Sequence, residues 1–341
     1  MEKVLVTGGG GYIGCVLVPQ LLECGYAVRI LDRFFFGRDL IANHEHIEII
    51  REDSRRIRAD HLAGIDHVID LVALSNDPSG ELFEQSTWEI NHGSRVHTAN
   101  LAKQLGIKRY IFPSSCSIYG FQEAGVVADE NSPINPLTTY AKANRKAEEG
   151  ILPLADSEFC AVAMRQATVY GYSPRMRFDL AVNGMTYGAL ITGKLPLLRD
   201  GTQWRPMVHV QDTARALAFM LSADVERING EIFNVGSPEN SYQLESLAKK
   251  VAKTVPRDVE IEWYGDPDHR SYRVAFDKIE SLGFKARYVA EDGVREVTRA
   301  LEEGRTDKTS KTLTLKWYQE LVKWHALIQQ TAMHGGIVDL P

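Results

Sequence analysis

"KVLVTGGGGYIG", residues 3–14, joins a β-branched run to a glycine-rich turn that opens an apolar helical segment. Within the turn, Gly8, Gly11 and Gly14 are spaced as GxxGxxG. Glycines at this spacing permit a tight turn and let the backbone approach a pyrophosphate, while the first amides of the following helix attract phosphate charge. The stretch therefore predicts a strand, a phosphate-binding turn and a helix, which together favour a dinucleotide cofactor.

Asp32 ends the next predicted strand, AVRILD, at residues 27–32. A carboxylate there can accept hydrogen bonds from the hydroxyls of an adenosine ribose, and it repels a 2′-phosphate. Arg33 beside it could accommodate that phosphate, so NAD is favoured and NADP stays open. The residues predicted to bind the cofactor are Gly8, Gly11, Tyr12, Ile13, Gly14, Asp32, Arg33, Asp53, Ser54, Leu71, Ala73, Tyr140 and Asn144.

Short β-branched or aromatic runs recur through the first half of the chain, and stretches with helical periodicity lie between most of them. Alternating strands and helices, with strands that are apolar along their whole length, are typical of a parallel sheet covered on both faces. We therefore predict an α/β fold with a Rossmann-like doubly wound parallel sheet. The predicted strands are residues 3–7, 27–32, 46–50, 67–73, 109–115 and 160–165.

After about residue 170 the alternation gives way to longer loops. Residues 208–236 supply one more helix and strand, which we expect to return to the main sheet. The prediction is an NAD-binding Rossmann domain over residues 1–170, with a smaller C-terminal substrate-binding α/β region over the strand ends, where open α/β sheets bind ligands. That region comprises residues 171–207 and 237–341.

The bulk composition favours small-molecule chemistry. A net charge of -6 over 341 residues offers no basic surface, so we expect no nucleic-acid partner and no membrane partner. An acid at position 2 and the early glycines fit neither a signal peptide nor a membrane helix, and a cytoplasmic location is expected. The four cysteines lack metal-ligand spacing, so we predict neither disulfides nor a metal site.

The chain also contains, in order, TGGGGYIG (7–14), SSCSIYG (114–120), Tyr140 opening a helix, RQATVYG (165–171), WRPMVHVQD (204–212), FNVGS (233–237) and HRSYRV (269–274). This ordered set resembles the extended short-chain dehydrogenase/reductases that act as nucleotide-sugar epimerases and dehydratases. The resemblance covers essentially the whole chain. It implies bound NAD, a nucleotide-sugar substrate and, by analogy, a homodimer.

In such enzymes a tyrosine phenolate takes a proton from a sugar hydroxyl as hydride leaves the same carbon for the nicotinamide. Tyr140 matches that tyrosine. A phenol with a pKa of about 10 needs a nearby cation to ionise at neutral pH, and the family places a lysine four residues on, on the same helical face. Here that position holds Asn144, while Lys142 and Lys146 should point away. We expect NAD binding to persist and proton abstraction to be slower or shifted to higher pH.

Three residues of SSCSIYG complete the predicted catalytic set. Ser115 stands where the family keeps a serine or threonine that hydrogen-bonds the reacting oxygen. Family 4,6-dehydratases carry an aspartate and a glutamate at the next two positions, which supply and remove protons during elimination. Here these positions are Cys116 and Ser117, which argues against a 4,6-dehydratase. Cys116 could act as an acid or base for epimerisation, or it could be a buried thiol without chemistry.

The substrate side carries cations suited to a diphosphate. Arg205 and Arg270 match family positions that resemble diphosphate anchors, and guanidinium suits bidentate phosphate contact. Thr168 replaces an asparagine usual in the family, which leaves the sugar's identity open. The residues predicted to bind the substrate are Ser75, Asn76, Arg177, Asn183, Arg205 and Arg270.

Three functions fit these features. The first is a redox-neutral, NAD-dependent nucleotide-sugar 4-epimerase with a transient 4-keto intermediate, because it needs no acid and base beyond the tyrosine. The second is an NAD(P)-dependent keto-sugar reductase or another nucleotide-sugar-modifying oxidoreductase. The third, motivated by Asn144, is a non-catalytic sensor of NAD or nucleotide sugars.

Overall fold

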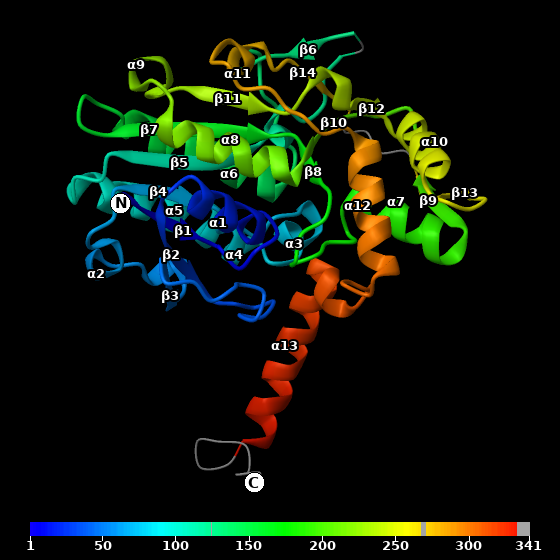
Figure 1. Cartoon of the computed structure of the whole chain (residues 1–341), viewed down its shortest axis with the longest axis horizontal. Coiled ribbons are helices and arrows are strands. Elements are labelled where there is room, and N and C mark those ends of the chain that lie inside the picture. The colour runs from blue at the N-terminus through cyan, green and yellow to red at the C-terminus, as the bar shows by residue number, and fades with distance from the viewer. Residues whose placement is uncertain (124, 267–270, 333–341) are drawn as a thin grey trace.

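The computed structural model describes residues 1–123, 125–266 and 271–332. Within them, a seven-stranded sheet forms the centre of the molecule, and all neighbouring strands run parallel (Figure 1). The predicted doubly wound sheet is confirmed, and its strand order reverses between β1 and β4. The order is β11 (Ile232–Val235), β7 (Cys160–Gln166), β5 (Arg109–Ser115), β4 (His67–Asp70), β1 (Lys3–Thr7), β2 (Ala27–Asp32) and β3 (Ile47–Arg51).

Apolar side chains from the central strands enter two cores, one on each face of the sheet. On β1, Val4 and Val6 enter one core and Leu5 enters the other, because successive side chains of a strand point to opposite faces. Helices α1 and α8 cover the first face, and α2, α5 and α6 cover the second. Both faces of the sheet are therefore buried, which explains why the strand sequences are apolar along their whole length.

The helices of this layered unit follow the strands in sequence, apart from a π-helical segment at Glu89–Ser94 that leads into α5. They are α1 (Gly14–Glu23), α2 (Ala59–Leu62), α3 (Asp77–Leu82), α4 (Glu84–Trp88), α5 (Arg95–Gln104), α6 (Thr139–Ile151), α8 (Val210–Ser222) and α9 (Val225–Ile228).

A third core lies in the C-terminal part, where α7, α10 and α12 pack on short strands. Its strands form small sheets over the carboxyl ends of the main strands (Figure 1). The strands that enter this core are β8 (Thr168–Tyr170), β9 (Lys194–Leu198), β10 (Trp204–His209), β12 (Ser241–Gln243) and β13 (Glu260–Tyr264). Two further short strands, β6 (Val127–Ala128) and β14 (Arg273–Val274), pair with each other and pack on the first core of the main sheet. The helices are α7 (Ala181–Tyr187), α10 (Leu244–Thr254), α11 (Asp277–Ser281), α12 (Ala290–Glu302) and α13 (Thr314–Thr331).

The structure refines two of the predicted strands. The run 67–73 forms a strand only to Asp70, because the chain then turns past the glycine loop, where a Cβ on Gly8 would lie 3.0 Å from the Val72 nitrogen. The run 46–50 is a strand one residue later, at Ile47–Arg51. The segment 208–236 supplies α8 and β11, and β11 pairs with β7 at the edge of the main sheet.

Candidate functional site

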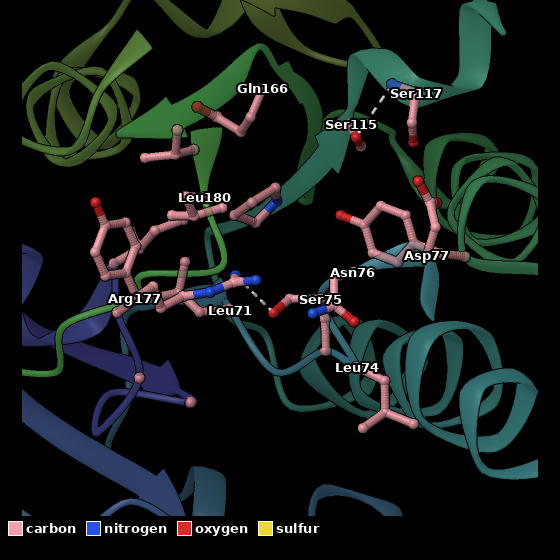
Figure 2. Close-up of a pocket in the computed structure, with 18 of the residues that line it drawn as sticks. Leu71, Leu74, Ser75, Asn76, Asp77, Ser115, Ser117, Gln166, Arg177 and Leu180 are labelled. Carbon is pink, nitrogen blue, oxygen red and sulfur yellow. Dashed lines mark hydrogen bonds between the residues drawn. The ribbon is translucent and has the colours of Figure 1, made fainter. Parts of the chain in front are cut away.

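A cavity of about 700 Å³ lies at the carboxyl ends of the main strands, on both sides of the point where the strand order reverses. Figure 2 shows Ser115 and Ser117 on one side of it and Arg177 with Leu71 on the other. The cavity is lined by Gly8, Gly11, Tyr12, Ile13, Gly14, Asp32, Arg33, Asp53, Ser54, Leu71, Ala73, Ser75, Asn76, Ser115, Ser117, Tyr140, Arg177 and Arg205 from the predicted set. Asn144, Cys116 and Asn183 lie outside its lining, and Arg270 lies outside the described residues.

The glycine turn is packed so closely against neighbouring protein atoms that it has no room for side chains. Gly8 has a φ of +70°, and a Cβ on Gly14 would lie 2.4 Å from the Gly9 carbonyl oxygen. Helix α1 begins at Gly14, so its N-terminal amides point toward the cavity and favour negative charge there. A turn packed too closely on its own backbone to accept side chains, followed by helix amides that face the cavity, fits the diphosphate of a dinucleotide such as NAD.

Asp32 lies at the end of β2, in the wall of the cavity. Its carboxylate accepts hydrogen bonds from the amides of Gly10 (3.0 Å) and Phe34 (2.6 Å). Burial raises the pKa of Asp32, and those backbone donors oppose the rise. Neighbouring Arg33 pairs with Asp53 at 3.1 Å. The guanidinium that could have received a 2′-phosphate is therefore already engaged with a carboxylate.

Tyr140 and Ser115, the predicted catalytic pair, line the same cavity. Tyr140 is the second residue of α6, whose N-terminus is capped by Thr138, and Ser115 is the last residue of β5. Burial raises the pKa of Tyr140, while the charge of Arg95, the hydrogen bond from Ser115 and the charge of Arg177 lower it. Asp77 acts in the raising direction. Two arginines and one aspartate therefore act on the Tyr140 phenol, and the arginines favour its ionised form.

Two of the predicted catalytic residues do not reach the cavity. Cys116 is fully buried, its thiol donates to the Arg165 carbonyl oxygen (3.2 Å), and burial raises its pKa, so it packs as a neutral thiol. Asn144 is 1% exposed, and its amide donates to the Tyr140 carbonyl oxygen at 3.0 Å. Ser117 does line the cavity.

Arg177 reaches into the cavity but does not carry a free charge. It donates to both carboxylate oxygens of Asp179, at 3.1 and 2.7 Å, and to the Ser75 hydroxyl at 3.0 Å (Figure 2). Asn76 donates to the same carboxylate at 3.0 Å. The cluster therefore orients hydroxyl and amide groups toward the cavity, and its net charge is close to zero.

The other predicted substrate residues differ in position. Arg205, on β10, lines the cavity with its guanidinium 5.4 Å from the centre of the Tyr272 ring. Asn183 is fully buried beneath the cavity, where its side chain accepts from the Gly171 amide and donates to the Tyr12 hydroxyl and the Arg177 carbonyl. Asn183 therefore supports the cavity wall through buried hydrogen bonds and does not itself face the cavity.

Several cavity residues were missed by sequence reasoning. Gln166, the last residue of β7, is 6% exposed, and its amide has no hydrogen-bond partner among the described residues. Arg95 is buried and lines the cavity. A helical pattern places Arg95 on one face with Ala99 and Ala102, and this single cation on an apolar face was the available signal.

Helix α13 packs beside the part of the cavity wall that contains Asp32, through contacts distant in sequence. Trp317 donates its indole N–H to the Phe35 carbonyl oxygen at 2.7 Å. Tyr318 lines the cavity and packs on Phe35 and Phe36, and the Arg175 guanidinium lies 3.6 Å from the centre of the Phe36 ring. The rest of α13 extends away from the body of the molecule (Figure 1). We call Phe35, Phe36, Arg175, Trp317 and Tyr318 the aromatic clasp.

Two further observations bear on the class of protein. Among residues 1–123, 125–266 and 271–332, no helix has the length and apolar character needed to span a bilayer. The same residues contain no group of three or more His, Cys, Asp or Glu side chains placed to hold a metal ion, and all four cysteines are free thiols.

Comparison with known proteins agrees with this geometry. UDP-glucose 4-epimerase 2 of Arabidopsis thaliana is 26% identical over 345 residues, covering 88% of this chain and 94% of the relative. UDP-glucuronic acid decarboxylase 4 of the same plant is 27% identical over 307 residues, covering 86% and 67%. The structure of MoeE5 in complex with UDP-glucose and NAD matches with a TM-score of 0.77 at 26% identity, covering 89% of this chain and 100% of that one.

The model of the NAD dependent epimerase/dehydratase family matches residues 4–236, which is most of the chain. That span contains the glycine turn, Ser115 and Tyr140. The resemblance drawn from the motifs is confirmed: the chain belongs to the NAD-dependent epimerase/dehydratase family, within the extended short-chain dehydrogenase/reductases.

Proposed function

We propose that this protein is an NAD-dependent nucleotide-sugar 4-epimerase. The observation that carries the proposal is the pairing of Ser115 with Tyr140 in a cavity whose other end is a dinucleotide cradle. Bound NAD would supply the acceptor for hydride from C4 of the sugar and the donor for its return to the other face of the ring. The fold supplies a volume of about 700 Å³ for cofactor and sugar together.

The residues of the chain then have distinct tasks. Tyr140 holds and returns the proton of the sugar's C4 hydroxyl at its phenol oxygen, and Ser115 orients that oxygen by hydrogen bonding. Asp32 and the turn around Gly8 hold the two ends of the cofactor's adenosine diphosphate. Arg205 lines the cavity, and we assign to it the contact with the substrate's diphosphate.

Epimerisation is favoured over dehydration by the residues that follow Ser115. A 4,6-elimination needs an acid and a base beyond the tyrosine. Cys116 is buried outside the cavity, and Ser117 offers only a hydroxyl. NAD is proposed over NADP because Asp32 is negative and Arg33 is engaged by Asp53.

The proposal also includes the division into two binding regions, the remaining sugar contacts, the oligomeric state and the location. Residues 1–170 with 208–236 would bind the cofactor, and residues 171–207 with 237–341 would bind the nucleotide sugar. Arg177, Asn183 and Arg270 stay proposed contacts or supports of that sugar. A homodimer in the cytoplasm is proposed from the family resemblance.

The test begins with mass spectrometry of cofactor released from the gently denatured protein. The protein is then incubated with UDP-glucose, UDP-galactose, UDP-glucuronic acid and dTDP-glucose, and products are identified by NMR and mass. An epimer of unchanged mass, absent with Tyr140→Phe, is the expected result. Loss of carbon dioxide or water would replace the epimerase by a decarboxylase or a dehydratase. Net oxidation or reduction of the added cofactor would establish a reductase. Cofactor without conversion of any sugar would favour the sensor.

A further inference from the structure

Asn144 replaces the family's lysine, but its side chain binds another cation, the guanidinium of Arg95. Its Nδ2 donates to the Tyr140 carbonyl oxygen at 3.0 Å, which fixes the amide so that Oδ1 accepts from Nη1 of Arg95 at 2.7 Å. Asn144 is 1% exposed and Arg95 is 2% exposed, so water does not screen this contact. A neutral amide on α6 therefore holds a guanidinium that comes from α5.

No carboxylate of the described residues pairs directly with the Arg95 guanidinium. The buried carboxylate of Asp70 lies on the other side of the Tyr110 hydroxyl, which donates to Asp70 and to the Arg95 carbonyl oxygen. Arg95 forms no salt bridge within the described parts of the chain, and its Nε has no hydrogen-bond partner there. Its guanidinium carbon lies 4.7 Å from the centre of the Phe112 ring, a cation–π contact that stabilises the charge without cancelling it. Burying an arginine without a carboxylate is costly, so its presence in the cavity wall favours a functional use.

We propose that Arg95, clamped by Asn144, is the positioning residue that supplies the positive charge for Tyr140, in place of the lysine at position 144. This inference rests on the proposed function. In the reaction, the sugar's O–H bond breaks and its proton passes to the Tyr140 phenolate oxygen. The electron pair of the C4–H bond leaves as hydride to the nicotinamide, and the carbon becomes a carbonyl. Arg95 stabilises the phenolate before the transfer and stays protonated throughout.

The surrounding charges support this assignment. Of the groups that lower the pKa of Tyr140, Arg95 has the largest effect. Arg177 lowers it less, and its charge is engaged by Asp179. Burial and Asp77, at the start of α3, raise it. Lys142 and Lys146 lie on the exposed face of α6 and are not among the main groups that shift the pKa of Tyr140.

Tyrosine labelled with ¹³C at Cζ provides a direct test by NMR, with the Tyr140 signal identified by its loss in Tyr140→Phe. The pH midpoint of this signal is measured in cofactor-free and in NAD-loaded protein. Arg95→Gln should raise the midpoint by about one pH unit or more, a tenfold loss of phenolate. Arg95→Lys should stay near the parent because it keeps the charge. Lys142→Gln, which removes one cation from the exposed face of α6, is the matched control and should change nothing.

A second variant covers the case in which Arg95→Gln does not fold. Arg95→Met with Asn144→Leu removes both partners together and leaves no unpaired polar group, a change that is often neutral for stability. It should raise the Tyr140 midpoint as Arg95→Gln does. An unchanged midpoint in whichever of these variants folds would overturn the proposal. The titration needs no sugar turnover, so it gives its answer even if the proposed epimerase activity is absent.

Discussion

Gln166 is the buried polar side chain in the cavity wall whose amide lacks a partner within the described structure. In the sheet register it lies directly beside Ser115. An unpaired amide at this position is suited to the carboxamide of a nicotinamide ring, to which it can both donate and accept. The missing partner is therefore expected to arrive with the cofactor.

Gln166→Leu should weaken NAD binding about tenfold, because two hydrogen bonds worth roughly 0.5–1.5 kcal/mol each are lost. The cofactor-free protein should keep its stability, since the amide makes no internal bond. Calorimetric titration and thermal unfolding measure the two quantities. Gln203→Leu is the control: Gln203 is also buried and unpaired in the described structure but does not line the cavity. Equal NAD affinity of the Gln166 variant and the parent would show that the amide faces no cofactor atom.

The ionisation of Asp179 should make the free energy of unfolding depend on pH. Burial alone would raise its pKa, but the charge and hydrogen bonds of Arg177 dominate and lower it from 3.8 to about 2. A carboxyl with a depressed folded pKa stabilises the fold above its unfolded pKa, and that contribution disappears as the pH falls through the folded value. Because Asp179 is partly exposed to solvent, the pair should lose only about 1 kcal/mol of stability between about pH 4 and pH 2.

Urea unfolding at a series of pH values measures this loss. Asp179→Asn should flatten the acid limb of the stability curve by about that amount, although it also lowers stability at neutral pH by leaving Arg177 unpaired. Asp39→Asn, at an exposed carboxylate, should leave the limb unchanged. Parallel acid limbs for the parent and the Asp179 variant would contradict the assignment of the shift to this pair.

At the scale of elements, the aromatic clasp ties α13 to the loop after β2. Trp317→Phe keeps an aromatic ring but removes the N–H bond to the Phe35 carbonyl oxygen. Losing about 1 kcal/mol from this contact should speed release of NAD roughly fivefold. Stopped-flow displacement of bound cofactor measures the rate. Leu327→Ala, on the same helix and 55% exposed, should release NAD at the parent rate.

The elements were predictable from sequence because their physical signals are local. Strands buried on both faces read as continuous apolar runs, and the glycine turn and Asp32 are fixed by their places at strand ends. The end of β4 at Asp70 was not predictable, because the close approach of Gly8 to Val72 ends it and that contact depends on the tertiary fold. The partner of Asn144 was hidden for the same reason: Arg95 lies 49 positions earlier.

At the scale of the whole molecule, cofactor binding should couple to global stability, because the cavity joins the main sheet to the C-terminal part. A ligand that binds only the folded chain stabilises it by about 2.7 kcal/mol at a hundred times its Kd. NAD should therefore raise the unfolding temperature, and NADP should raise it less because Asp32 repels the 2′-phosphate. Calorimetry with each nucleotide at equal concentration makes the comparison. A larger rise in unfolding temperature with NADP than with NAD would reverse the proposed cofactor preference. Asp32→Ser should reduce the difference between the unfolding temperatures measured with NAD and with NADP.

The indole of Trp317 and the carbonyl of Phe35 that meet in the aromatic clasp are 282 positions apart. On a ribosome adding about 5–20 residues per second, Phe35 would wait roughly half a minute for Trp317 to be synthesised. The early strands and the glycine turn can assemble during that interval while this side of the nucleotide groove stays open. Lasting capture of the nucleotide thus becomes a late event of biogenesis, which follows translation of α13 and does not accompany the first folding of the sheet.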